Sequence, residues 1–188
     1  KKRYDSVRKV MPMLQKEIKK YAAHHVRWKV QRTGYSKQQY ELKPEEEVIV
    51  VLDHKQKIIS MRNREGQIEY FGKKGMSLCG ANIIRRVIKG GGVVGYEHHY
   101  FDFIIDGYQD QDHIQVAAII QIMLDEVKNK FPDVKRVILK TDNASCMSSH
   151  NNIPFIYHLN KELKKNHGDY QVVRWMNMAD RGAPIPVP

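Results

Sequence analysis

The chain has 188 residues, 41% of them hydrophobic, and a formal net charge of +11 at pH 7. This length is typical of one domain with its own core, and no apolar run approaches the roughly 20 residues that a membrane-spanning helix needs. The two cysteines, Cys79 and Cys146, form no Cys-x-x-Cys pair, which argues against a disulfide scaffold and a cysteine zinc site. We therefore expect a soluble, intracellular protein that does not contact a membrane.

The positive charge is concentrated at the start of the chain. Residues 1–43 contain 13 Lys and Arg against 3 Asp and Glu, a balance of +10. Aromatic residues are interleaved with this charge, so the segment could neutralise phosphates and stack on bases. The cations expected to contact nucleic acid here are Lys16, Lys19, Lys20, Arg27, Lys29 and Arg32.

The same segment also has the pattern of an amphipathic helix. Apolar or semi-apolar residues recur every three or four positions at Val7, Val10, Leu14, Ile18, Tyr21, His25 and Trp28. Such a stripe predicts a helix that packs on a core, with the cations as its solvated face. Pro12 is expected in its first turn or at the break after a short preceding segment. The packing and nucleic-acid interpretations are compatible, and both stay open.

A second region, residues 44–178, follows a polar boundary and alternates strands with helices. Strands are predicted at 47–54, 57–61 and 67–72, with a turn at 62–66, then at about 77–88 and 95–106. Gly90, Gly91 and Gly92 predict a turn between the last two. They lack the Gly-Lys-Ser/Thr ending of a phosphate-binding P-loop.

The remaining elements are two helices and two strands. A helix from about residue 114, with Asp112 near its N-cap, should stop at Pro132; a strand then ends at Asp142. A helix at about 154–166 should stop at Gly168 and lead into a strand at 170–176. Residues 179–188 are expected to be an irregular, proline-rich tail, and the whole chain a fragment of a longer protein.

Two buried-strand patterns each lead into one aspartate. Residues 48–52 precede Asp53, and residues 137–141 precede Asp142. The element order predicts an α/β, RNase H-like mixed sheet: three or more antiparallel strands followed by helix, strand, helix and strand, with a basic N-terminal helical extension. In that fold the first and fourth strands are neighbours, so the two carboxylates would meet and hold Mg²⁺ or Mn²⁺ for phosphoryl transfer.

These motifs carry a family resemblance. Asp53 after Val-Ile-Val-Val-Leu, and Leu139-Lys-Thr-Asp142-Asn143-Ala-Ser-Cys146, resemble the first two acidic motifs of the transposase and integrase branch of the RNase H-like superfamily. Over about residues 20–180 the chain is most similar to transposon-derived proteins of animals, whose pattern is matched by His25, Trp28, Gln31, Gln39 and Lys73-Lys74-Gly75. The resemblance implies DNA cleavage or strand transfer, a nuclear location and work as a homo-oligomer.

The resemblance also implies a third acid. Asp180, 38 residues after Asp142, would complete a catalytic and metal-binding set with Asp53 and Asp142. Asp112 is the alternative third ligand, because ribonucleases of this fold take an acid from the first core helix. Lys55 is expected either to pair with Asp53 or to contact phosphate.

Two other functions stay open. An exonuclease of this fold would carry Asp-x-Glu in its first strand, where this chain has Asp53-His54-Lys55. A domesticated, non-catalytic module would keep the fold and the basic helix for binding nucleic acid or protein.

Cys146 is interpreted as a buried thiol rather than a nucleophile, since no His or Asp is fixed beside it.

Overall fold

The chain divides into two compact units, Lys1–Glu41 and Leu42–Pro188, each described here by itself. The structure is a computed structural model that describes residues 2–59, 64, 66, 75–105, 111–142, 144–147, 149–177 and 185–186. The strand predicted at 67–72 and the candidate acid Asp180 lie outside these residues.

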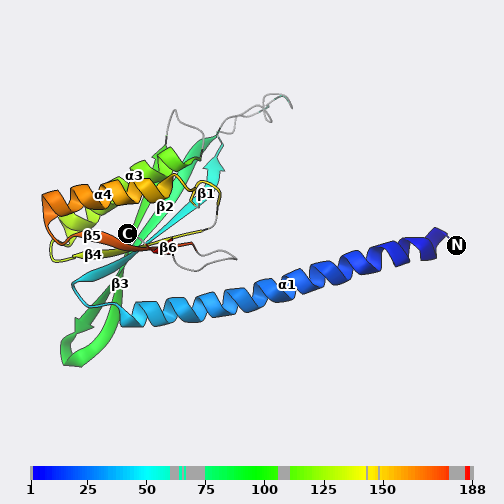
Figure 1. Cartoon of the computed structure of the whole chain (residues 1–188), viewed down its shortest axis with the longest axis horizontal. Helices are drawn as coiled ribbons and strands as arrows, with labels where there is room; N and C mark the ends of the chain where they lie inside the picture. Colours follow the sequence, from blue (N-terminus) through cyan, green and yellow to red (C-terminus); the bar gives the residue numbers. More distant parts are fainter. Residues whose placement is uncertain are drawn as a thin grey trace. The chain divides into compact units, whose positions relative to one another are not determined.

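The first unit is a single α-helix, α1 (Lys2–Glu41), with Pro12 inside it (Figure 1). The prediction that Pro12 would lie in the first turn or at a break was wrong. A proline inside a helix costs roughly 3 kcal/mol, because it lacks an N–H and its ring clashes with the preceding turn. Residues with high helix propensity, such as Lys, Arg, Gln, Leu and Met, flank it on both sides, and they continue the helix past this local cost.

The second unit is built on a mixed six-stranded sheet with the order β3-β2-β1-β4-β5-β6. Its strands are β1 (Glu47–Ile58), β2 (Met76–Lys89), β3 (Val93–Ile105), β4 (Arg136–Thr141), β5 (Gln171–Asn177) and β6 (Ile185–Pro186). The first three pair antiparallel, β4 pairs parallel with both β1 and β5, and β6 pairs antiparallel with β5. The predicted α/β class with a mixed sheet is confirmed.

Two predictions about element boundaries differ from the structure. The separate strand at 57–61 was wrong, because residues 57 and 58 belong to β1, which continues through Asp53 while it pairs with β2. In the predicted irregular tail, Ile185 and Pro186 form an edge strand. Proline is tolerated there because an edge strand leaves one side of its backbone unpaired. The predicted glycine turn agrees with a short 3₁₀ turn at Gly90–Gly92, where Gly91 and Gly92 have φ of 81° and 78°.

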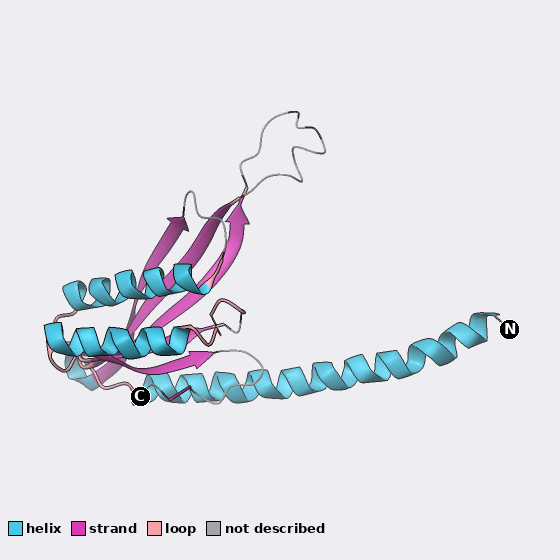
Figure 2. Cartoon of the chain, turned by 45° about the horizontal axis from the view of Figure 1, so that its top comes forward, coloured by secondary structure: helices cyan, strands magenta, loops and turns pink. Residues whose placement is uncertain are grey.

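Two helices, α3 (His113–Lys130) and α4 (Asn152–His167), lie side by side over one face of the sheet (Figures 1 and 2). Alternate residues of β1, namely Val48, Val50 and Leu52, face them and are fully buried. The helices contribute their own apolar faces to this core, so burial of the shared surface holds the layers together. Asp112 caps α3 as predicted, and Gly168 ends α4.

Buried polar groups tie the second helix and the last long strand into this core. Asn160 of α4 donates through Nδ2 to the Val172 carbonyl at 2.9 Å and accepts from the Val172 N–H at 2.8 Å. The Tyr170 hydroxyl donates to the Leu124 carbonyl at 2.8 Å. Each bond satisfies a group that burial would otherwise leave unpaired, and so fixes the position of the helices on the sheet.

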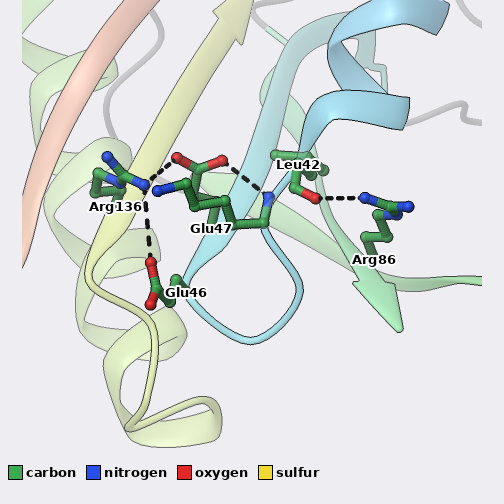
Figure 3. Close-up of polar contacts among 6 residues, drawn as sticks. Leu42, Glu46, Glu47, Arg86 and Arg136 are labelled. Atoms are coloured by element: carbon green, nitrogen blue, oxygen red, sulfur yellow. Dashed lines mark hydrogen bonds and ion pairs between the residues drawn. The ribbon is translucent and has the colours of Figure 1, made fainter. Parts of the chain in front are cut away.

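The amino end of β1 is held by charged contacts (Figure 3). Arg136, the first residue of β4, pairs with Glu47 at 2.8 Å and with Glu46 at 3.8 Å. The Glu47 carboxylate also accepts from the backbone N–H of Lys43 at 3.0 Å, and Arg86 donates to the Leu42 carbonyl at 3.1 Å. The ion pairs of Arg136 join the start of β4 to the start of β1, at the end of the sheet opposite to Asp53 and Asp142.

Candidate functional site

The two predicted acids lie on neighbouring strands. The parallel pairing of β1 with β4 runs as far as Leu52 opposite Thr141. Asp53 follows Leu52, and Asp142 follows Thr141. Adjacent strands are roughly 4.8 Å apart, so the backbones that carry the two carboxylates are adjacent. Asp53 is exposed and Asp142 is half-buried. Sequence reasoning expected both at strand ends; only Asp142 is at one, since β1 continues along β2.

Asp142 is oriented by its own turn. One carboxylate oxygen, Oδ1, accepts a hydrogen bond from the Ala144 backbone N–H at 3.0 Å, the pattern of an Asx turn. Just before it, the buried Thr141 accepts at Oγ1 from the Trp175 indole N–H at 3.0 Å. The strand end is therefore fixed from β5, and the carboxylate has a defined position before any ligand arrives.

His54, which follows Asp53, was missed as a site residue. Successive side chains of a strand point to opposite faces, so His54 points away from the face of Asp53. It shares the helix-covered face with Val50 and Leu52. Within the described part of the chain, neither ring nitrogen of His54 has a hydrogen-bond partner, although both are buried. Burial lowers the pKa of His54, and the opposing charges of Asp142 and Asp53 do not overcome this effect. The result is a neutral imidazole. It does not form a group with Asp53 and Asp142 that is close enough to hold a metal ion among the described residues.

Two buried thiols lie near these groups. Cys79 is opposite His54 in the β1–β2 register, and burial raises its pKa to about 12. Burial also raises the pKa of Cys146, and the negative charges of Asp142 and Asp112 add to this effect. Both side chains are therefore thiols at neutral pH, and a protonated thiol is a poor nucleophile. This agrees with the interpretation of Cys146 as a buried thiol.

Lys55 forms an ion pair with Asp102 of β3. Asp53, Gly80 and Asp102 are in register across β1, β2 and β3, and the lysine side chain lies over the glycine between them. A Cβ atom at Gly80 would be 2.6 Å from Lys55 Cε. Both side chains of the ion pair are exposed, Lys55 at 46% and Asp102 at 59%. A phosphate could therefore replace the Asp102 carboxylate as the partner of Lys55.

Lys140 of β4 is a buried cation, and its burial was not predicted from the sequence. It is opposite Val51 in the β1–β4 register, two residues before Asp142, and only 4% of it is exposed. Burial lowers its pKa to about 8. Residues two apart on a strand share a face, so Lys140 shares a face with Val51 and Asp53.

The third acid is not found among the described residues. Asp112 uses its carboxylate to cap α3, where Oδ1 accepts from the Gln115 N–H at 3.0 Å. Across the described ranges, no three His, Cys, Asp or Glu side chains are grouped closely enough to hold a metal ion. Asp180 lies outside those ranges. The donors that the described residues offer are thus the two carboxylates of Asp53 and Asp142.

The predicted basic surface is exposed on α1. All six of its cations, Lys16, Lys19, Lys20, Arg27, Lys29 and Arg32, are solvent-accessible. Lys20 pairs with Glu17 at 2.6 Å, and the Arg32 guanidinium lies 5.3 Å from the centre of the Trp28 ring. An exposed guanidinium over an indole is a combination that stacks on nucleic-acid bases.

The apolar stripe of α1, on which the packing interpretation depends, is exposed within its own unit. Leu14 is 49% exposed, Ile18 57% and Trp28 47%. The unit consists of one helix, and so it contains no second element on which the stripe could pack. His25 instead lies edge-on between Tyr21 and Trp28, with ring centroids 6.0 and 5.6 Å away.

Comparison of the chain with protein-family models, curated proteins and solved structures found no significant match. Among the described residues, no helix combines the length and apolar character needed to cross a membrane.

Proposed function

We propose that the second unit is an RNase H-like domain that performs metal-dependent phosphoryl transfer on DNA, by strand cleavage or strand transfer. The observation that carries this proposal is the adjacency of Asp53 and Asp142 on the parallel strands β1 and β4. The sheet order around them, with an antiparallel β3-β2-β1 set continued by parallel β4 and β5, supports it further. A DNA substrate would give the protein a nuclear location.

The residues fit a hard divalent cation through their donor chemistry. Carboxylate oxygens suit Mg²⁺ or Mn²⁺, and Asp142 is already oriented by its Asx turn. When bound, the metal would activate the attacking water or hydroxyl and stabilise the leaving oxygen. Asp53 and Asp142 would hold it, with Asp180 as the proposed third ligand. Lys55, beside Asp53, would leave Asp102 to contact a phosphate of the substrate.

The test is DNA cleavage in Mn²⁺ by the full chain and by Asp53→Asn and Asp142→Asn. Each substitution keeps the side-chain shape and removes a ligand charge, so we expect at least about a 100-fold loss of cleavage and weaker Mn²⁺ binding by calorimetry. Asp133→Asn is the matched control, because this exposed acid precedes β4 at the opposite end of the strand. Cleavage or metal binding that survives both site variants would contradict the proposal.

A second candidate function is non-catalytic binding of nucleic acid, and the exposed cations of α1 favour it. Neutralising Lys16, Lys19 and Lys20 together with glutamine should reduce the slope of log affinity against log salt by up to about 3. The control is the same change at Lys161, Lys164 and Lys165, exposed cations of α4. Binding that depends on α1, with no cleavage in any metal, would favour this function over the enzyme. An equal effect of both triple variants would leave α1 with no specific role.

A further inference from the structure

β3 is a long strand at the edge of the sheet. Its inner side pairs with β2 along its whole length, from Val93 opposite Lys89 to Ile105 opposite Ser77, without a register shift. No strand among the described residues pairs with its outer side. The outer row of backbone N–H and C=O groups is therefore a template on which another strand can pair.

This edge lacks the features that normally prevent pairing. Protected edges are short, or they carry lysine, proline or a bulge. β6, at the other edge of the sheet, has two residues and ends in Pro186. β3 has thirteen residues, with the sequence VVGYEHHYFDFII, which contains no lysine, arginine or proline and has Glu97 and Asp102 as its charged residues. One edge of the sheet is thus protected, and the other is open.

Apolar surface borders the open edge on both sides of the sheet. On the helix-covered side, a groove of about 490 Å³ separates β3 from α3, lined by Phe103 and Ile105 from the strand and by the helix residues Ile114, Ala118 and Ile122. Ile114 and Ile122 are 61% and 49% exposed. On the other side of the sheet, Tyr100 is 75% exposed and Ile104 59%.

We propose that the open edge of β3 binds β3 of a second copy of this chain, antiparallel and about a two-fold axis at Tyr100. A two-fold interface must be complementary to itself. With Tyr100 opposite its own copy, His98 lies opposite Asp102, and Tyr96 lies opposite Ile104, each pair occurring twice. Every one of these side chains is on the same face of the strand as Tyr100, so the polar and the apolar groups match across the dyad.

The pattern of polar residues favours this register over the one with His99 on the dyad. Opposed residues of antiparallel strands share a face, so the register can shift only in steps that keep each side chain on its own face. With His99 on the dyad, Asp102 would lie opposite Tyr96 and His98 opposite Tyr100, so Asp102 would have no basic residue opposite it on the second copy. The Tyr100 register also adds His98 to the existing ion pair of Asp102 with Lys55.

The same symmetry covers the groove. A two-fold axis perpendicular to the sheet places both copies of α3 on the same face, one on each side of the dyad. The exposed stripe of Ile114, Ala118 and Ile122 then faces its own counterpart, which removes apolar area from water. The interface does not use the proposed metal ligands Asp53 and Asp142. It shares with the site proposed above only Asp102, the partner of Lys55.

The first experiment measures the mass of the full chain by sedimentation over a range of concentrations. We expect a dimer, and we expect Tyr100→Lys to raise its Kd at least about tenfold, because two cations then meet at the dyad. Tyr157→Lys is the control, since Tyr157 is an exposed tyrosine on α4 and its replacement should leave the dimer intact. Circular dichroism checks that each variant is folded.

The second experiment tests the register. Tyr100→Cys should give a disulfide-linked dimer on mild oxidation, because a residue on the dyad lies opposite its own copy within disulfide reach. Tyr157→Cys should not. His98→Asp alone should weaken the dimer, and combining it with Asp102→His, which exchanges the two residues of the pair, should restore it. A monomer at every concentration, a dimer unaffected by Tyr100→Lys, or cross-linking through His99→Cys instead of Tyr100→Cys would overturn the proposal.

Discussion

The buried amine of Lys140 makes the stability of the second unit depend on pH in a defined direction. Its pKa is lowered from 10.5 to about 8 by burial, which corresponds to about 3 kcal/mol of differential stabilisation of the neutral form. Between pH 8 and 10.5 the unfolded chain binds more protons at this lysine than the folded chain does. Stability contributed by Lys140 therefore rises with pH across this window, and the cost of burying its charge is fully present below pH 8.

Lys140→Met removes the buried charge and keeps the length of the side chain. At pH 7 the variant should have a higher unfolding free energy than the parent. This gap between the two proteins should be about 3 kcal/mol smaller at pH 10.5 than at pH 7. Urea denaturation of both proteins at a series of pH values measures this gap, and other groups that titrate in the window cancel in the comparison. Lys161→Met, at an exposed lysine of α4, should give a gap that does not vary with pH. A Lys140 gap that is equally flat, or that widens as pH rises, would refute the reasoning.

Three further substitutions, two of them with a matched comparison, test the stability of the second unit by urea denaturation. Gly75→Ala should destabilise the unit more than Gly80→Ala. The new Cβ at residue 75 would lie 2.8 Å from the Ile58 backbone carbonyl, whereas at residue 80 it would meet the flexible end of the Lys55 side chain. Equal losses of unfolding free energy would contradict this. Asp112→Ala should cost about 1 kcal/mol through the lost cap of α3, whereas Asp125→Ala, at an exposed position of that helix, should cost less. Asn160→Ala should cost about 3 kcal/mol, because both polar groups of Val172 lose their partner; a loss below about 1 kcal/mol would show that water replaces the amide.

Local patterns predicted the parts of the fold that depend on local physics. The apolar run at 48–52 and the helical period of residues 113–130 gave the correct elements, because burial on one face or two imposes those periods. The element order then placed Asp53 and Asp142 on neighbouring strands. The length of β1 could not be found in this way. Its second half, which contains His54 and Lys55, is polar, and it remains a strand because β2 supplies backbone partners from distant residues.

Burial of polar side chains was the other feature that the sequence concealed. Lys140 and His54 belong to residue types that are mostly exposed or intermediate, so composition alone assigns them to the surface. The sheet topology buries Lys140 beside Val51 and places His54 on the helix-covered face. Alternation along β1 could have identified His54, because it continues the series Val48, Val50 and Leu52. No comparable signal distinguishes Lys140 from a solvated lysine in a short strand.

The parallel pairing of β1 with β4 also has a consequence for how the chain reaches this structure. Glu47 and Arg136 are neighbours in the sheet but about 90 residues apart in the chain, so the closure of a long loop precedes their contact. The β1-β2-β3 meander, in contrast, can form as soon as residue 105 has left the ribosome. Until α3 and α4 follow, the apolar side of that meander and the open edge of β3 would be exposed together, which are the features that favour aggregation of an incompletely folded chain.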